Sequence, residues 1–204
     1  MPIYKPSELR KYLKELGISP TKRLSQNFLL DGNIIRKIIA YADIKPHDVV
    51  LEIGPGPGAL TEALVETGAK VLAVEKDKVL ASALERLKGE DQKLEIFCDD
   101  ILTFAIEKEV SAHLSGNQKA KVIANLPYNL TTPIMIHFTP LHHLFSQLVV
   151  MVQEEVARRF TARPSTKDYG SLTVFLNFFS TPHYGFRVSK NCFFPKPRVE
   201  SAVV

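Results

Sequence analysis

The chain has 204 residues, 45% of them hydrophobic, which is enough for one sizeable core but leaves no room for a second domain of ordinary size. It contains no apolar run long enough to span a bilayer and no basic-then-apolar leader, so we expect a cytoplasmic protein without a membrane partner. Cys98 and Cys192 lie far apart and outside any metal-ligand spacing, which argues against a disulfide framework or a zinc site and predicts two buried thiols.

The net charge of +4 is distributed unevenly along the chain. Lysines and arginines exceed acids by five in residues 1–37 and again by five in residues 155–204, whereas residues 38–154 have a net charge of −6. If both ends fold over one face, they form a positive rim suited to phosphates. A solvated, mixed surface explains the same distribution, so charge alone leaves both interpretations open.

The first predicted elements are two helices. Residues 7–16 have leucines at helical spacing, with Ser7 in the N-cap position and Gly17 after the last turn. A second helix is expected to begin near Asp31 and to bury a group of isoleucines.

From residue 49 onward, apolar strands alternate with helices. The strands are predicted at residues 49–53, 70–74, 94–98, 121–124 and 148–152, and the helices at residues 58–67, 79–88 and 133–138, followed by a basic helix through Arg158 and Arg159. After a helix at residues 172–179, the segments 184–188 and 199–204 are expected to be extended and antiparallel. This pattern predicts an α/β fold: a doubly wound, mostly parallel seven-stranded sheet with an antiparallel strand near the C-terminus.

A glycine-rich turn, Gly54-Pro-Gly56-Pro-Gly58, follows the first strand of the alternating series and opens a helix. Open α/β sheets bind nucleotides at this position, and glycines let a ligand approach the backbone closely. The glycines alone fit either a nicotinamide dinucleotide or S-adenosylmethionine, and a tight turn without a ligand is the remaining alternative. The preceding carboxylate of Glu52 and the stiffening prolines favour S-adenosylmethionine.

Acidic residues recur at the ends of successive strands. Glu75 ends the second strand about twenty residues past the glycine turn, where nucleotide-binding folds hold ribose hydroxyls. Asp100 follows the third strand and is expected to accept the adenine amine of the cofactor. Asp77 and Asp99 are better explained as helix N-caps.

Asn125-Leu126-Pro127-Tyr128 closes the fourth strand of the series. An amine conjugated to a purine is a poor nucleophile, because its lone pair is delocalised into the ring. If the Asn125 side-chain oxygen and the Leu126 carbonyl accept its two hydrogens, the lone pair becomes available for attack. Pro127 would fix the turn, and Tyr128 could stack on a flipped base. A β-turn with a buried tyrosine is the structural alternative.

Together these motifs resemble the ribosomal RNA adenine dimethyltransferases of the KsgA type, which have a Rossmann-like class I methyltransferase fold. The resemblance extends over nearly the whole chain and includes residues 23–29 (RLSQNFL), 153–159 (QEEVARR), 169–173 (YGSLT) and 193–201 (FFPKPRVES). It implies a catalytic group of Asn125, Leu126, Pro127, Tyr128 and Phe194, with Phe194 against the target base opposite Tyr128. It also implies a cofactor site of Gln26, Asn27, Leu29, Glu52, Gly54, Gly56, Glu75, Lys76, Asp100, Ile101 and Asn125.

The resemblance implies direct transfer of two methyl groups from S-adenosylmethionine to an adenine N6 amine, without a metal, leaving S-adenosylhomocysteine. The expected partner is small-subunit ribosomal RNA in an immature subunit, bound by a monomer. Residues 1–204 would form the catalytic domain, and the small helical C-terminal domain of the family is expected to be missing from a truncated chain. His137, His142 and His143 are expected to be surface or packing residues.

Three alternatives remain open from the sequence. One is an antibiotic-resistance methyltransferase of large-subunit RNA, which shares the main motifs, although residues 169–173 favour the small-subunit type. Another is a non-catalytic RNA-binding or transcription factor on the same fold, against which the retained Asn125 and Tyr128 argue. The third is a nicotinamide-dependent dehydrogenase, for which no convincing hydride-transfer residues are found.

Overall fold

The computed structural model describes residues 6–18, 27–90 and 92–204. The helices are α1 (Pro6–Glu15), α2 (Gly32–Tyr41), α3 (Ala59–Glu66), α4 (Lys78–Ala83), α5 (Ile106–Ser111), α6 (Thr131–Phe138), α7 (Glu154–Phe160) and α8 (Ser171–Phe179), with 3-10 turns η2 (Leu84–Leu87) and η3 (Lys190–Cys192). The strands are β1 (Phe28–Leu29), β2 (Val49–Ile53), β3 (Lys70–Val74), β4 (Leu94–Phe97), β5 (Ala120–Asn125), β6 (Phe145–Gln153), β7 (Phe186–Val188), β8 (Phe193–Phe194) and β9 (Ser201–Val203).

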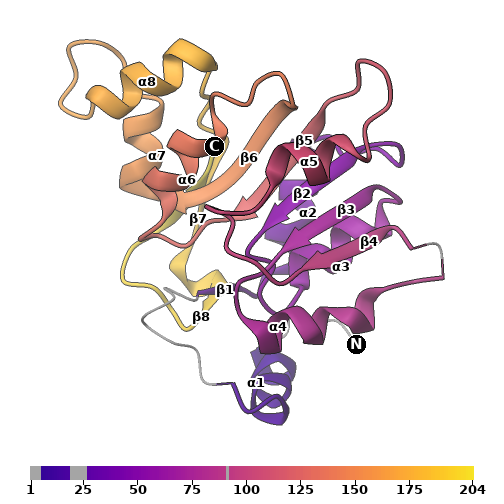
Figure 1. Ribbon diagram of the computed structural model, residues 1–204. Helices are drawn as coiled ribbons and strands as arrows, with labels where there is room; N and C mark the ends of the chain where they lie inside the picture. The colour runs from indigo at the N-terminus through magenta and orange to yellow at the C-terminus, as the bar shows by residue number, and fades with distance from the viewer. Residues whose placement is uncertain (1–5, 19–26, 91) are drawn as a thin grey trace.

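A seven-stranded sheet in the order β4-β3-β2-β5-β6-β9-β7 forms the centre of the molecule (Figure 1). Strands β2 to β6 pair in parallel with one another, whereas β9 runs antiparallel to both β6 and β7. The predicted mostly parallel sheet with an antiparallel strand near the C-terminus is therefore confirmed. The strand order reverses between β2 and β5, and in open α/β sheets ligands bind outside the carboxyl ends of the strands at such a reversal.

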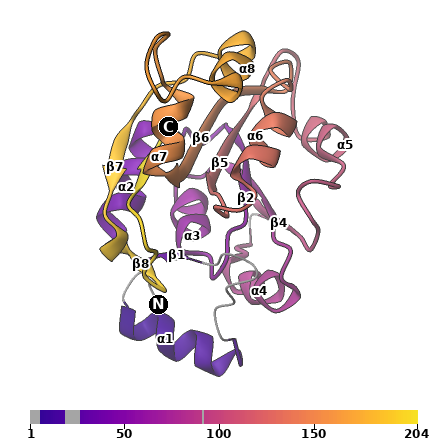
Figure 2. The same ribbon diagram turned by 90° about the vertical axis from the view of Figure 1, so that its left-hand side faces the viewer.

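Helices cover both faces of this sheet, because successive residues of a strand point to opposite sides (Figure 2). Leu51 and Ile53 of β2 belong to a core with buried residues of α5, α6, α7 and α8. Val50, on the opposite face, packs in a second core with α2 and α3. All five residues of β2 are buried, as expected for a central parallel strand.

A smaller unit lies beside the carboxyl edge of the sheet and was not predicted. Strand β1 pairs antiparallel with β8, which joins Phe28 to Phe194 and Leu29 to Phe193. Two-residue strands carry no periodic signal, so their pairing becomes visible only in the folded chain. Helix α1 packs against this ladder.

Several predicted helices differ in detail from those observed. Helix α1 begins at Pro6, so the prediction of Ser7 as its N-cap is wrong; proline is well suited to a first turn, where its missing N–H costs nothing. Gly17 has the expected left-handed conformation, with a φ of 67°. The helix predicted at residues 79–88 divides into α4 and η2, and α5 was not predicted.

The two cysteines differ from their prediction as buried thiols. Cys98 is exposed, because it follows the last residue of β4, an edge strand of the sheet. Cys192 is half-buried, and its Sγ lies 3.4 Å from Asp31 Oδ2. Burial and this carboxylate raise the pKa of the Cys192 thiol to about 11, so it is a poor nucleophile at neutral pH.

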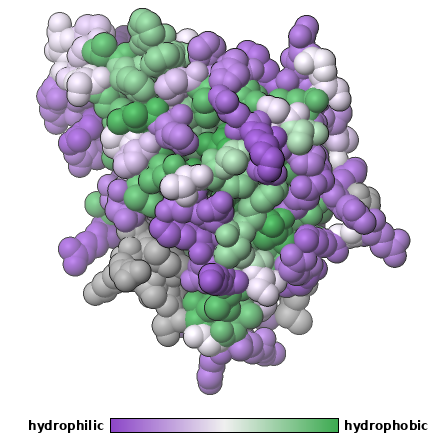
Figure 3. Space-filling view, in the orientation of Figure 1, coloured by the Kyte–Doolittle hydropathy of each residue, from purple (hydrophilic) through white to green (hydrophobic). Residues whose placement is uncertain are grey.

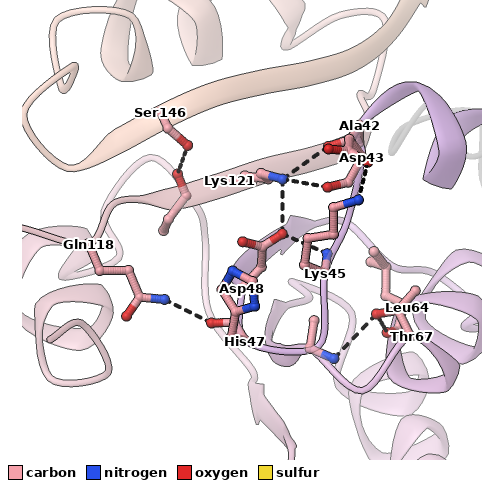
Figure 4. A network of polar contacts seen from close by, with 12 residues as sticks. Ala42, Asp43, Lys45, His47, Asp48, Leu64, Thr67, Gln118, Lys121 and Ser146 are labelled. Atoms are coloured by element: carbon pink, nitrogen blue, oxygen red, sulfur yellow. Dashed lines mark hydrogen bonds and ion pairs between the residues drawn. The ribbon is translucent and has the colours of Figure 1, made fainter.

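An ion pair holds the amino edge of the sheet together (Figure 4). Lys121, near the start of β5, lies 2.9 Å from the carboxylate of Asp48, which directly precedes β2. The Lys121 ammonium also donates to the carbonyls of Ala42 and Asp43, at 3.2 and 2.8 Å. These three acceptors use all three N–H donors of the ammonium group, which therefore acts in holding the fold together.

Apolar side chains gather on the surface over α8 (Figure 3). The Phe178 and Val174 side chains of this helix are 80% and 51% exposed. Of the three histidines expected at the surface or in packing, His142 stacks on Phe179, and all three are exposed. Within the described ranges, no helix is both long and apolar enough to cross a membrane.

Candidate active site

A cavity of about 300 Å³ opens at the carboxyl edge of the sheet. This volume lies at the lower end of the range typical of small-molecule sites. Among the predicted site residues, the cavity is lined by Asn27, Gly54, Gly56, Glu75, Lys76, Asp100, Ile101, Asn125, Leu126, Pro127 and Tyr128. Residues from five separate stretches of sequence therefore meet at the predicted place.

The glycine turn supplies a backbone wall that no larger residue could form. Gly56 has a φ of 59°, and a Cβ on it would lie 3.0 Å from the Phe28 ring. Gly58 has a φ of 93°, and a Cβ there would lie 2.6 Å from a methyl carbon of Leu84. Because φ is positive and space is short, both positions require glycine, and a ligand can approach the bare backbone.

Glu75 lies at the end of β3 with its carboxylate directed toward the glycine turn. It is 7% exposed, and its Oε2 and Oε1 accept hydrogen bonds from the backbone N–H groups of Gly56 and Asp77, each at 2.9 Å. Burial raises the pKa of the carboxyl group, and these backbone donors oppose the rise. A carboxylate has about four acceptor positions, so Glu75 can hold the turn and still accept hydroxyl groups of a ligand.

Asp100 follows β4 on the neighbouring wall and forms an ion pair with Lys76. The two groups are 2.6 Å apart, and the other Asp100 oxygen accepts from the Leu102 N–H at 3.1 Å. The hydrogen bond from Lys76 is the main reason why the pKa of Asp100 is lowered. Ile101 beside it is buried and lines the same wall. The pair thus closes the cavity between the ends of β3 and β4.

Asn125 ends β5, and its side chain has a defined orientation. Its Nδ2 donates to the backbone carbonyl of Asn27 at 2.9 Å. A carbonyl can only accept, so the amide nitrogen must face Asn27 and Oδ1 is the atom left to act as an acceptor. The N-terminal motif therefore orients the amide of the Asn-Leu-Pro-Tyr motif, although the two lie 98 residues apart.

Tyr128 forms another wall of the cavity and is tied to the far side of the sheet. Its hydroxyl lies 2.7 Å from Oγ of Ser201, which is fully buried in β9. Burial raises the pKa of Tyr128, which keeps the phenol protonated. The ring is therefore held at its backbone and at its hydroxyl, which presets the plane it presents to the cavity.

The structure does not bring every predicted residue to this cavity. Gln26 lies outside the described residues. Leu29 is buried in the core shared with α2 and α3, so its side chain is not in the described cavity wall. Phe194 pairs with Phe28 through the β1–β8 ladder and packs against α1 with Arg10 over its ring, also outside that wall.

Glu52 is placed differently from the prediction. It is the fourth residue of β2 rather than a residue at the strand end, and it points away from the described cavity wall. It is 1% exposed, and its Oε2 has no hydrogen-bond partner among the described residues. Burial raises the pKa of Glu52 to about 8, with Thr61 opposing and the Glu75 charge adding to the rise. The acid is thus protonated at neutral pH.

Sequence reasoning missed several residues that shape the site, and three of them stand out. Phe28 and Leu80 line the cavity, and Ser201 anchors Tyr128. Phe28 and Ser201 both lie inside motifs that the sequence analysis identified, but the motifs indicated no role for these two side chains. Leu80 had no distinguishing signal beyond helical spacing.

The sequence and the fold both match known methyltransferases. Residues 19–204 match a family model described as ribosomal RNA adenine dimethylase. The ribosomal RNA small subunit methyltransferase A of Protochlamydia amoebophila is 62% identical over the whole chain, which covers 72% of that protein, and the one of Chlamydia muridarum is 48% identical over 97% of the chain and 69% of its own length.

Solved structures give the same grouping. A dimethyladenosine transferase from Plasmodium falciparum superposes with a TM-score of 0.72 at 29% identity, over 86% of this chain and 61% of that one. The 23S rRNA methyltransferase ErmE gives a TM-score of 0.72 at 28% identity, over 87% and 68% of the two chains. The chain thus spans 61–72% of the length of these relatives. By its motifs, its fold and its sequence, the chain belongs to the ribosomal RNA adenine dimethylase family.

Proposed function

We propose that this chain is the catalytic domain of an enzyme that transfers two methyl groups from S-adenosylmethionine to the N6 amine of adenines in small-subunit ribosomal RNA. The observation that carries this proposal is the Asn125 amide, held by Asn27 so that its oxygen is an acceptor at the wall of a cavity shared with Tyr128. The product is N6,N6-dimethyladenosine.

The cavity suits the methyl donor through several groups of this chain. The glycine turn gives backbone access, Glu75 can accept ribose hydroxyls, and Asp100 can accept the adenine amine of the donor. When bound, S-adenosylmethionine supplies a methyl group on a positively charged sulfur and leaves as S-adenosylhomocysteine. The remaining cofactor positions from the sequence, Gln26, Leu29 and Glu52, stay predictions for the bound state.

The target amine is activated by acceptors rather than by a general base. Asn125 Oδ1 and the Leu126 carbonyl accept hydrogen bonds from its two N–H groups, which frees the nitrogen lone pair to attack the methyl carbon. As the N–C bond forms, the bond from that carbon to the donor's sulfur breaks, and the methylated amine then loses one proton to water. Tyr128 stacks on the extruded base and holds it in line for transfer. Phe194 belongs to the opposite side of the base, and from its present place against α1 it would have to approach the cavity when RNA binds.

The RNA partner follows from the relatives and from the charge distribution. The relatives from Protochlamydia amoebophila and Chlamydia muridarum are named small-subunit methyltransferases, and the basic ends of this chain suit a phosphate backbone. An immature small subunit in the cytoplasm is the proposed context, with the chain acting as a monomer. The 62% identity to a small-subunit enzyme, against 28% to ErmE, favours this target over large-subunit RNA.

The test is product analysis on ribosomal particles. Small and large subunits that lack adenine dimethylation are incubated with this chain and methyl-labelled S-adenosylmethionine, and the RNA is digested to nucleosides. Labelled N6,N6-dimethyladenosine from small subunits is the expected result. Label only in large subunits, or none in either, would contradict the proposal.

The variant Asn125→Ala tests the role of the Asn125 amide in methyl transfer. Loss of one preorganised transition-state contact typically costs about 10²- to 10³-fold in rate, and we expect a decrease of this order in transfer. The dissociation constant for S-adenosylhomocysteine should change little, since other residues hold the donor. Full activity of Asn125→Ala would remove the mechanism even if the product is correct.

A further inference from the structure

Helix α1 lies outside the sheet and precedes the residues matched by the family model. Figure 1 shows it beneath α4 and close to β1 and β8. Its residues Leu9 and Leu13 are buried against Phe28, Leu30 and Leu80. Because Phe28 and Leu80 also line the cavity, α1 packs directly behind two of its walls.

A polar relay runs from α1 to the glycine turn. The Tyr12 hydroxyl donates to the Ala83 carbonyl at 3.2 Å and accepts from Nε of Arg86 at 3.0 Å. Arg86 Nη2 in turn donates to the carbonyl of Pro57 at 2.9 Å. The guanidinium carbon also lies 5.1 Å from the centre of the Tyr12 ring. One rigid guanidinium therefore joins α1, η2 and the turn.

The position of the Pro57 carbonyl affects the shape of the cavity wall. It stands between Gly56, which lines the cavity, and Gly58, which has no room for a side chain against Leu84. A small displacement of the Pro57 carbonyl thus moves the backbone that faces the ligand. A guanidinium can hold two acceptors in a fixed geometry, which suits Arg86 to this role.

We propose that α1 supports the cofactor site from behind its walls and that Tyr12 and Arg86 are positioning residues for the glycine turn. The proposal rests on the proposed function, because it takes the cofactor to bind against this turn. Tyr12 and Arg86 do not touch the cavity; they act through Pro57. On its other side, α1 places the Arg10 guanidinium 5.0 Å from the ring of Phe194, so the same helix contacts the loop expected near the target base.

The experiment measures S-adenosylhomocysteine binding by calorimetry for the unaltered chain, Tyr12→Phe, Arg86→Met and the double variant. Each single change removes hydrogen bonds of ordinary strength, so we expect the dissociation constant to rise about threefold to tenfold. The double variant should bind no more weakly than the weaker single variant, because both changes break one relay. Additive effects, or an unchanged constant in Tyr12→Phe, would overturn the proposal.

Two controls match the chemistry of these changes. Tyr41→Phe removes a phenol hydroxyl from α2, and Lys88→Met removes an exposed cation next to η2; neither should alter binding. Thermal unfolding provides a second measurement, since a purely structural role lowers the melting temperature with and without ligand alike. A positioning role reduces the ligand-induced increase in melting temperature. Equal increases in the variants and the unaltered chain would reject it.

The outcomes separate this inference from the proposed function. If the unaltered chain binds S-adenosylhomocysteine and the relay variants bind equally well, only the role of α1 is rejected. If the variants bind weakly but the unaltered chain fails to methylate ribosomal RNA, only the proposed function is rejected. No binding by the unaltered chain would reject both.

Discussion

At the amino edge of the sheet, the carboxylate of Asp48 contacts the ammonium of Lys121 and accepts from the backbone N–H of Lys45 (Figure 4). Near the carboxyl edge, Glu52 and Glu75 are buried, and burial is the main cause of their raised pKa values. A carboxyl group is thus paired with a cation at one edge, whereas near the other edge burial raises the pKa values of two carboxyl groups.

This difference separates carboxyl groups that stabilise the fold from carboxyl groups that could bind a ligand. A carboxylate that is paired with a lysine and a backbone N–H of its own protein contributes to folding. A buried carboxylate with acceptor positions left costs stability, because charging it in an apolar environment is unfavourable. Groups of the second kind gather where the strand order reverses, which is where the cavity lies.

The largest expected effect concerns Glu52 and pH. Its pKa in the folded state is about 8, above its ordinary value of 4.5, so the folded chain retains a proton that the unfolded chain loses between these values. The free energy of unfolding should therefore fall as pH rises through this window, by an amount on the order of 5 kcal/mol from this group. Below pH 4.5 both states hold the proton, and the penalty is absent.

Glu52→Gln isolates this contribution, because the amide cannot ionise. Denaturant unfolding of both proteins at pH 5 and pH 8 should show the variant gaining stability relative to the unaltered chain as pH rises. If the stability difference between the two proteins stays constant across the window, the pKa of Glu52 is not raised in the folded state. The contrast between the two edges would then be lost.

Lys121→Met tests the opposite edge. The variant leaves the half-buried Asp48 carboxylate without its cation, and breaking a buried ion pair costs about 3 kcal/mol or somewhat more of unfolding free energy. The affinity of the folded protein for S-adenosylhomocysteine should be unchanged. Lys119→Met, an exposed lysine on the preceding loop, is the matched control and should change stability little. A large loss of ligand affinity in Lys121→Met would show that the edges are coupled.

Glu75→Ala tests the carboxyl edge directly. Hydrogen bonds to a charged group are worth about 1.5–3 kcal/mol, so we expect the dissociation constant for S-adenosylhomocysteine to rise about 10- to 100-fold. Glu75→Gln keeps the shape and one acceptor oxygen, and its loss should be smaller. Calorimetry gives both values. Equal affinity in Glu75→Ala would remove the proposed contact with the ribose.

The smallest expected effect is at the link between Tyr128 and Ser201. Tyr128→Phe and Ser201→Ala each remove one partner of a single hydrogen bond, worth about 1 kcal/mol, or roughly fivefold in kcat/KM for RNA methylation. The double variant should be no worse than the single variants, since the bond is already lost. Ser146→Ala, a serine near the start of β6, is the control. Fully additive losses would show that Ser201 acts independently of the tyrosine ring.

Most of the sheet could be predicted because its strands are short apolar runs bounded by glycine, proline and charged residues. Residues 70–74 were placed at their observed bounds, and the strand at 121–124 was one residue short at each end. Helix α5 was missed because it has only six residues, and Cys98 was misplaced because edge exposure depends on which strand lies outermost. The edge position of a strand is not a local property of the sequence.

Where a motif follows a strand, its place in the fold could be predicted, and Glu75, Asp100 and Asn125 all line the cavity, while their roles toward a ligand stay predictions. The placement of Glu52 was harder to predict. Its spacing from the glycine turn is regular, but its position within β2 directs its side chain to the opposite face of the sheet. Strand alternation decides that direction, and a shift of one residue reverses it.

Local spacing and residue type in this chain were sufficient for the alternation of strands and helices, the glycine turn and the order of the acids, because each depends on neighbours a few residues away. Tertiary structure alone decided that Asn27 orients Asn125, that Ser201 holds Tyr128 and that α1 reaches Pro57 through Arg86. Those contacts join residues 29 to 98 positions apart, and only the packed sheet brings such residues within hydrogen-bonding distance.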